Sequence, residues 1–194
     1  MAIQQCCLRL LQQTNQLNVL VNDLATLAHA GAGSLAYEWQ PVSIVHSIQR
    51  AIASLQPAMQ AVQLHFTFNH NNLEPLVNGD AARLQQVWMN LLNNSLRYTQ
   101  APGRVVMQVV EHEKFVTVTL EDSAPSVAPA HLPRLFERFY RIDEHRQRKS
   151  GGSGLGLAIV AEIIAAHGGT ITAQPSVLGG LLIEVQIPRL VVKA

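Results

Sequence analysis

Three side-chain amides lie close together in the middle of the chain. Asn90, Asn93 and Asn94 are followed by Arg97. In a helix, Asn90 and Asn94 lie one turn apart and direct two amide oxygens the same way. Neutral oxygens suit Mg²⁺, which keeps several waters and relies on substrate phosphates, and Arg97 could add positive charge. These residues predict a magnesium–phosphate site, although such amides can also simply hydrogen-bond one another or nearby backbone.

A second cluster consists of glycines. The segment SGGSGLGLAIV, residues 150–160, contains Gly151, Gly152, Gly154 and Gly156 directly before an apolar stretch. Backbone N–H groups that are open to close approach at a helix N-terminus form an anion site. A glycine-rich loop can equally be a flexible hinge. The charged segment before it does not fit a dinucleotide fingerprint, and the lysine of a P-loop is absent.

The amide cluster must be positioned by a helix over residues 79–99. Asp80 is a typical N-cap, and no glycine or proline follows until after Thr99. The remaining circumference of this helix is apolar, which predicts that it is buried and presents only a polar stripe. The apolar positions are Leu84, Val87, Trp88, Leu91, Leu92 and Leu96.

The rest of the chain alternates between helical and strand-like patterns. We expect a helix from Pro41 to about residue 60, with a kink or an end at Pro57, and a helix over 155–167. Strands are expected over 62–68, 76–78, 104–110, 115–120, 171–173 and 181–187, the last two connected by a turn at Gly179 and Gly180. The order predicts an α+β fold: a two-layer α/β sandwich with a mixed sheet and helices on one face.

Residues 122–153 have no continuous period and contain Pro125, Pro129 and Pro133. A long irregular segment within a compact domain is usually a functional lid. Six basic residues lie in its second half, which could equally be a solvated loop. They are Arg134, Arg138, Arg141, Arg146, Arg148 and Lys149.

Length and composition narrow the classes of function. With 194 residues and 48% hydrophobic content, the chain can form one domain plus a smaller element. Its net charge of +1 argues against nucleic-acid binding as the main task. Cys6 and Cys7 are neighbours and cannot easily form a bridge, which indicates a reducing compartment. We find neither a signal peptide nor an apolar run of about 20 residues, and therefore expect this polypeptide to be soluble.

Residues 3–30 lack glycine and proline and carry leucines at spacings of three, four or seven. This pattern predicts a long N-terminal helix that packs in a two-helix or bundle seam, or else folds onto its own domain. Gly31 and Gly33 would end it, and we place a domain boundary near residue 37.

Taken together and in order, these motifs resemble the catalytic, ATP-binding domain of bacterial sensor histidine kinases in the GHKL superfamily. NLLNNSLRYT (90–99) is similar to the family's N box, and the DSAPS segment that begins at Asp122 to its first glycine box. LFERFYR (135–141) is similar to the F box, and GGSGLGLAIV (151–160) to the second glycine box. The likeness covers essentially the whole chain, is strongest to envelope-stress sensors, and implies the Bergerat fold.

The resemblance implies roles for individual residues. Asn94, with Asn90, would hold the Mg²⁺ that bridges the ATP phosphates, and Asp122 would accept a hydrogen bond from the adenine amino group. Tyr98 would line the base pocket, and Arg97 would meet phosphate. The other nucleotide-binding positions implied are Arg138, Gly152, Ser153, Gly154, Leu155, Gly156 and Leu157, and Phe136 and Phe139 would anchor the lid. Ala124 and Ser126 stand where the family usually has glycine, so the first hinge of the lid departs from the pattern.

The resemblance also implies an organisation. Residues 1–37 would be the second helix of the dimerisation and phosphotransfer domain, and 38–194 the catalytic domain with its lid at about 122–153. No histidine fits the acceptor pattern of His-Glu followed by proline. We therefore expect the acceptor to lie on a helix absent from this chain, which would belong to a longer sensor on the cytoplasmic side of the inner membrane. The membrane would be reached only through segments outside this chain.

The implied function is transfer of the γ-phosphoryl group of ATP to that histidine, for relay to a response regulator, in a protein that is a homodimer at full length. Two alternatives remain open. An ATP hydrolase of the same fold would have a carboxylate one turn before the metal-binding Asn94, where this chain has Asn90. A nucleotide-binding module without chemistry would need no acceptor at all.

Overall fold

A single mixed sheet organises the described part of the chain. The computed structural model describes residue 14 and residues 36–123, 125–142 and 153–191. The elements are β1 (Gln40–Ser43), α2 (Ile44–Ala61), β2 (Leu64–Asn69), β3 (Leu76–Gly79), α3 (Ala81–Tyr98), β4 (Gly103–Glu111), β5 (Phe115–Ser123), the 3-10 turn η1 (Leu132–Arg134), α4 (Gly156–Ala166), β6 (Thr170–Pro175) and β7 (Gly179–Pro188). The expected long N-terminal helix lies outside the described residues.

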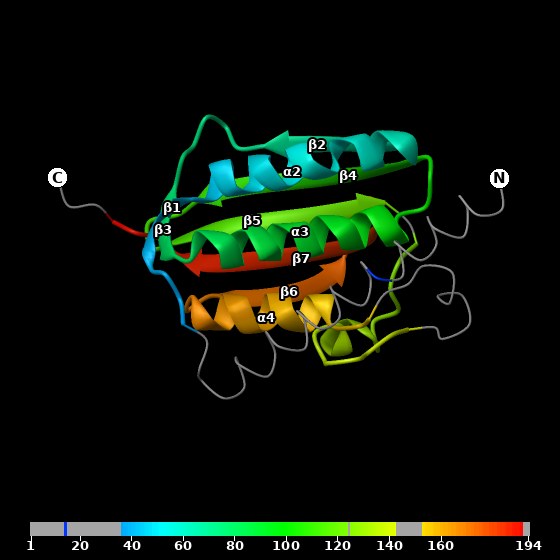
Figure 1. The fold of residues 1–194 in the computed structure, drawn as a ribbon. Coiled ribbons are helices and arrows are strands. Elements are labelled where there is room, and N and C mark those ends of the chain that lie inside the picture. The colour runs from blue at the N-terminus through cyan, green and yellow to red at the C-terminus, as the bar shows by residue number, and fades with distance from the viewer. Residues whose placement is uncertain (1–13, 15–35, 124, 143–152, 192–194) are drawn as a thin grey trace.

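The five-stranded sheet has the order β2-β4-β5-β7-β6. β2 and β4 are parallel, and the other neighbours are antiparallel. Helices α2, α3 and α4 all lie against one face of this sheet (Figure 1). The two-layer α/β sandwich with helices on one face is therefore confirmed. None of the helices in the described ranges is long and apolar enough to cross a membrane.

Helix α3 lies in the middle of the helical layer, as the apolar pattern predicted. Its buried side chains are Leu84, Val87, Trp88, Leu91, Leu92 and Ser95, and Leu96 packs against the core from a partly buried position. The helix begins as expected, because Asp80 Oδ1 accepts hydrogen bonds from the N–H groups of Ala82 and Arg83 at 2.9 and 3.0 Å. The polar stripe of α3 is half-buried, so about one helical turn of its side chains remains accessible to a ligand.

The start of α2 differs from the prediction. Pro41 lies in strand β1, which pairs with β3, and the helix begins at Ile44 with Ser43 as its N-cap. Proline fits at this position of β1 because the two-stranded ribbon has a free side where no N–H donor is needed. The helix also does not end at Pro57 but continues to Ala61.

Two boundaries near the expected lid are also different. Strand β5 continues to Ser123, so Asp122 belongs to the sheet and not to the lid. Gly179 and Gly180 are the first residues of β7, and the turn before them is closed by the Gly179 N–H, which donates to the Ser176 carbonyl at 3.0 Å. The domain division at residue 37 remains a prediction.

Candidate functional site

The amide stripe and the glycine loop meet in the structure. Asn90, on α3, donates a hydrogen bond from Nδ2 to the carbonyl oxygen of Gly156 at 3.3 Å. Gly156 is the first residue of α4, and a Cβ placed on it would lie 3.8 Å from the Asn90 side chain. Because a carbonyl can only accept, the amide nitrogen of Asn90 is committed to Gly156 and its amide oxygen is left for another partner.

Asn94 lies one turn further along α3 and is half-buried. Its amide makes no hydrogen bond with any residue in the described ranges, which leaves both its oxygen and its nitrogen available. Arg97 is exposed in the last turn of the same helix, and Tyr98 is 38% exposed. The helix therefore presents an amide oxygen, a cation and an aromatic ring in succession, as the sequence predicted.

Asp122 is held in a specific pocket of hydrogen bonds at the end of β5. Its Oδ1 accepts from the Leu181 N–H at 2.8 Å, and its Oδ2 accepts from the Ser95 hydroxyl at 3.3 Å. Burial raises the pKa of Asp122, although these two hydrogen bonds act in the opposite direction. A half-buried carboxylate with only part of its acceptor capacity used is suited to accept from a donor on a ligand.

The pairing of β5 with β7 directs the Asp122 side chain. The register of the two strands shifts between Glu121 and Ser123, and such an irregularity re-aims a side chain. A Cβ on Gly180 would lie 2.3 Å from Asp122 Oδ1, so only glycine leaves room for the carboxylate. Gly180, expected as a turn residue, therefore has a role at the site.

Three contributors to this site were not predicted: Ser95, Gly180 and Thr99. Thr99 is 8% exposed, and its hydroxyl is buried near Asp122 without a partner in hydrogen-bonding geometry. A signal was present for Ser95, because a serine occupies a buried position of α3 next to Asn94. Gly180 and Thr99 could not be found without the strand register, since nothing local in the sequence links them to Asp122.

The described part of the glycine loop is tightly organised. Ser153 Oγ accepts from the Leu155 N–H at 3.2 Å, and Leu155 is fully buried just before α4. Gly154 has a φ of +72° and its carbonyl accepts from the Phe139 N–H at 3.0 Å. Leu157 packs partly buried against the core. Within the described residues, the N-cap Leu155 makes no side-chain hydrogen bond to the first turn of α4, an arrangement that suits an anion at this helix end. Gly152 lies outside the described residues.

Two lid residues make contacts that the sequence did not predict. The Phe139 side chain is 63% exposed, so its backbone N–H, and not its ring, contacts the rest of the domain through Gly154. Phe139 also has a φ of +62°, in the left-handed region. Arg138 pairs with Glu162 on α4 at 2.9 Å instead of pointing freely toward a phosphate. Phe136 is partly buried, in agreement with an anchoring role.

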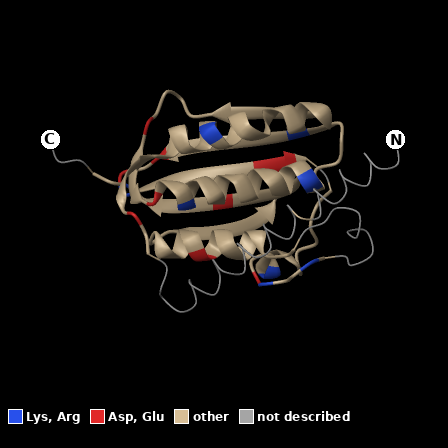
Figure 2. Cartoon of the chain, in the orientation of Figure 1, with Lys and Arg blue, Asp and Glu red and all other residues tan. Residues whose placement is uncertain are grey.

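The charges and donors fit a magnesium-bound nucleotide. Figure 2 shows basic residues at the C-terminal end of α3 and in the lid segment around η1, at the same end of the molecule. Within the described ranges, no group of three or more His, Cys, Asp or Glu side chains could hold a metal ion. A cation here would take its protein ligands from the oxygens of Asn94 and Asn90 and the rest from phosphate and water, a mode that suits Mg²⁺.

Comparison with known proteins places this geometry in a family. Residues 79–191 match the family described as "Histidine kinase-, DNA gyrase B-, and HSP90-like ATPase". Over 178 residues the chain is 40% identical to the signal transduction histidine-protein kinase BaeS of Escherichia coli strain K12, covering 91% of this chain and 38% of that protein. The chain thus spans less than two fifths of this relative's length.

Solved structures agree with the sequence comparison. The full-length histidine kinase ShkA, in complex with AMPPNP, has a TM-score of 0.84 at 26% identity, over 100% of this chain and 40% of that one. The histidine kinase ThkA, in complex with the response regulator protein TrrA, has a TM-score of 0.73 at 22% identity, over 91% and 49% of the two chains, and shares the fold. The resemblance to sensor histidine kinases is confirmed, and the chain belongs to the family of histidine kinase-, DNA gyrase B- and HSP90-like ATPases.

Proposed function

We propose that this chain binds ATP with Mg²⁺ and transfers the γ-phosphoryl group to a histidine on a helix that lies outside the described structure. The observation that carries this proposal is the hydrogen bond from Asn90 to Gly156, because it joins the amide stripe to the anion-binding end of α4. The family and the AMPPNP complex of ShkA support nucleotide binding.

Different residues contact different parts of the nucleotide. Asp122 accepts a hydrogen bond from the adenine amino group, and its acceptor-only character selects that donor over the carbonyl of guanine. The orphaned hydroxyl of Thr99 supplies a further partner in the same pocket, to the base or to a water beside it. Tyr98 lines one side of the base site from the end of α3.

The phosphates are held by backbone and charge. The N–H groups at the start of α4 face the phosphate chain, and Gly156 lacks a side chain that would block its approach. Asn94 and Asn90 would hold the metal through their amide oxygens, and Arg97 would add positive charge from the exposed end of α3. Bound Mg²⁺ offsets negative charge on the phosphates. The contribution of the protein is therefore positioning and charge neutralisation, as is general for phosphoryl transfer.

The acceptor and the downstream partner follow from the same proposal. A histidine ring nitrogen on a helix of the same or a partner subunit attacks the γ-phosphorus, and the bond to the β-phosphate oxygen breaks to release ADP. A response regulator then takes the phosphoryl group. The complex of ThkA with TrrA supports a partner of this kind. Dimerisation of the full-length protein belongs to this proposal as well.

Direct hydrolysis of ATP is the less favoured alternative. Asn90 stands one turn before Asn94, and its amide nitrogen is committed to Gly156. An amide cannot take a proton from water, so this site has no general base at the place where a hydrolase of this fold has a carboxylate.

Incubation with γ-labelled ATP and Mg²⁺ tests the proposal. The chain alone remains unlabelled and releases little phosphate, because no acceptor histidine is present. When a two-helix acceptor domain bearing the histidine is supplied, the label moves to that domain. A matched acceptor in which the histidine is replaced by glutamine remains unlabelled. Label on the chain itself, or rapid phosphate release without an acceptor, would contradict the proposed reaction.

A further inference from the structure

A buried histidine lies at the opposite end of the helical layer from the proposed nucleotide site. His167 follows α4 directly and is 6% exposed. Its Nδ1 lies 2.7 Å from the Ile163 carbonyl oxygen, and its Nε2 lies 3.0 Å from the backbone nitrogen of Asp80. A carbonyl only accepts and an N–H only donates, so Nδ1 carries the proton and Nε2 accepts. The ring is neutral and both of its nitrogens are used.

His167 contacts the residue at which α3, the other helix of the site, begins. Asp80 is the N-cap of α3, and its Oδ2 also accepts from the Glu38 N–H at 3.0 Å. A Cβ on Gly79 would lie 2.9 Å from the His167 ring, so glycine is required for this close approach. The end of α4, the start of α3 and the segment that enters from the N-terminal side therefore meet at one point.

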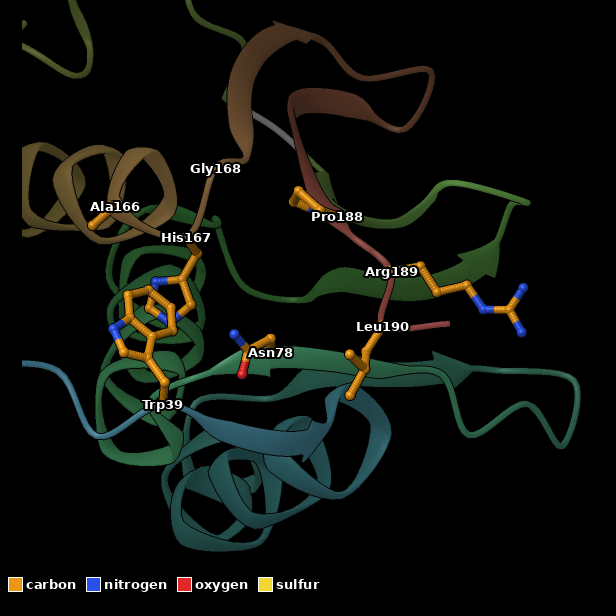
Figure 3. Close-up of a pocket in the computed structure, with 8 residues that line it drawn as sticks. All are labelled: Trp39, Asn78, Ala166, His167, Gly168, Pro188, Arg189 and Leu190. Carbon is orange, nitrogen blue, oxygen red and sulfur yellow. The ribbon is translucent and has the colours of Figure 1, made fainter. Parts of the chain in front are cut away.

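Two aromatic rings of the entering segment pack on His167. The ring centroids of Trp39 and His167 are 5.0 Å apart, and those of Tyr37 and His167 are 5.6 Å apart in an edge-on contact. Trp39 is 47% exposed and forms one wall of an open cavity of about 440 Å³. Figure 3 shows its ring against that of His167, with Asn78 nearby among the residues that line the cavity. The contact is accessible and can be altered from outside.

Two hydrogen bonds join α3 and α4, one at each end of α4; on α3 one is at the N-cap and the other in the middle of the helix. At one end His167 accepts from Asp80, and at the other Asn90 donates to Gly156. On α3 ten residues separate the two bonds, and on α4 eleven. At about 1.5 Å per residue these are spans of roughly 15 and 17 Å. Because the spans nearly match, a shift of one helix along the other at His167 must also change the Asn90–Gly156 contact.

We propose that the Tyr37–Trp39–His167 cluster is the joint through which the segment preceding the domain sets the register of α3 against α4, and thereby the affinity of the nucleotide site. His167 acts as a positioning residue, since it touches neither nucleotide nor metal. The proposal rests on the proposed function, because the site whose affinity is set is the ATP site. It assigns regulation to a cluster roughly 15 Å from the nucleotide loop.

Coupling between two sites is reciprocal, which defines the test. A change at the joint that alters ADP affinity requires that ADP binding alter the joint. The chain contains two tryptophans, and Trp88 is fully buried, so quenching of tryptophan fluorescence by acrylamide reports on Trp39. Saturation with ADP·Mg²⁺ is expected to reduce the quenching of Trp39 in the unmodified protein.

The complementary test changes residues of the Tyr37–Trp39–His167 cluster and measures the affinity for ADP·Mg²⁺. Trp39→Ala is expected to weaken ADP·Mg²⁺ binding in calorimetry by about five- to tenfold, the lower end of the usual range of coupling between sites. Trp39→Phe keeps a ring on His167 and restores most of the affinity. Val62→Ala removes a comparably exposed apolar side chain, 41% exposed at the end of α2, and leaves affinity unchanged. His167→Gln retains an acceptor for the Asp80 N–H and binds more tightly than His167→Leu.

The possible outcomes distinguish a failure of the proposed joint from a failure of the proposed function. If His167→Leu does not fold, Trp39→Ala still decides, because its side chain is half-exposed. Folded Trp39→Ala protein with unmodified ADP affinity, together with quenching that ADP does not change, would overturn the joint. Failure of the unmodified protein to bind ADP would instead overturn the proposed function. A loss of thermal stability without a loss of affinity would assign the cluster to folding alone and contradict the proposal.

Discussion

At the scale of single residues, the clearest relation between burial and function is at Asp122. Its carboxylate is half-buried and partial burial raises its pKa, while Leu181 and Ser95 donate hydrogen bonds to it. A carboxyl whose folded pKa lies above its unfolded value lowers the stability of the fold as pH rises from the unfolded to the folded pKa, and the loss is complete above the folded pKa. The protein therefore tolerates a small loss of stability in order to keep a charged acceptor in the pocket.

Asp122→Asn separates these two effects. The amide oxygen can still accept from the Leu181 N–H, so the free energy of unfolding at neutral pH is expected to be unchanged or slightly raised. Binding of ADP is expected to weaken by about 10- to 100-fold, since a hydrogen bond to a charged acceptor is worth roughly 1.5–3 kcal/mol. Calorimetry and urea unfolding measure the two quantities.

Glu184→Gln on the neighbouring strand β7 is the matched control, because its side chain is half-buried and lies outside the site. It is expected to bind ADP normally. If Asp122→Asn bound ADP as tightly as the unmodified protein, the carboxylate would not be the group that recognises the adenine base.

Some of this site could be predicted from residue types and some could not. The spacing of Asn90 and Asn94 and the glycines before α4 indicated a metal–phosphate site, because helical periodicity alone places those groups on one face. Gly180 and Thr99 depend on the register between β5 and β7 and on the end of α3, which no local pattern specifies. The phosphate role of Arg138 stays a prediction, and its pairing with Glu162 could not be predicted because it depends on the packing of the lid on α4.

At the scale of elements, helices α3 and α4 could be predicted from the sequence, whereas the start of α2 could not. The apolar pattern predicted both helices and their buried faces, since burial of one face requires periodic apolar residues. The start of α2 was wrong by three residues, because Pro41 fits both the first turn of a helix and an edge strand. The pairing of β1 with β3, which decides between them, is not local in sequence.

The joint at the ends of α3 and α4 predicts a dependence of stability on pH. Burial lowers the pKa of His167 below its ordinary value, although Ile163 and Asp80 act in the opposite direction. When pH falls through the unfolded pKa of about 6.5, the unfolded chain binds a proton that the folded protein does not. The free energy of unfolding is therefore expected to fall as pH is lowered from about 7 toward the folded pKa, by at most about 1.4 kcal/mol per pH unit.

Urea unfolding at a series of pH values from 5 to 8 measures this slope. His167→Gln has no titrating ring and is expected to lose the part of the slope that falls between the two pKa values. His65→Gln, an exposed residue on β2, is expected to keep it. Identical slopes for His167→Gln and the unmodified protein would show that the neutral ring is not what the fold requires.

At the scale of the whole molecule, the fold could be predicted because each layer has its own period. Alternating residues indicated the strands and three-to-four spacing indicated the helices, and their order favoured a sheet covered on one face. The strand order β2-β4-β5-β7-β6 could not be derived in the same way, because it depends on pairings between distant segments. The sequence motifs supplied the family, which the comparisons then confirmed.

The whole molecule also explains why two helix ends matter. The proposed nucleotide site and the joint lie at opposite ends of the α3–α4 pair, and a hydrogen bond connects the helices at each of them. The segment that enters at Tyr37 contacts His167 at the end of α4, beside the N-cap of α3. In the proposed kinase, this is where an upstream signal would reach the ATP site.

A calorimetric titration of the chain with ADP, ATP and GTP, each with and without Mg²⁺, tests the central claim most directly. The account predicts that both adenine nucleotides bind, that Mg²⁺ tightens ATP, and that GTP does not bind. Asn94→Ala is expected to abolish the effect of Mg²⁺, whereas Asn93→Ala, half-buried on the same helix, retains it. Equal binding of GTP and ATP, or an Asn94→Ala protein that responds to Mg²⁺ as the unmodified chain does, would contradict it.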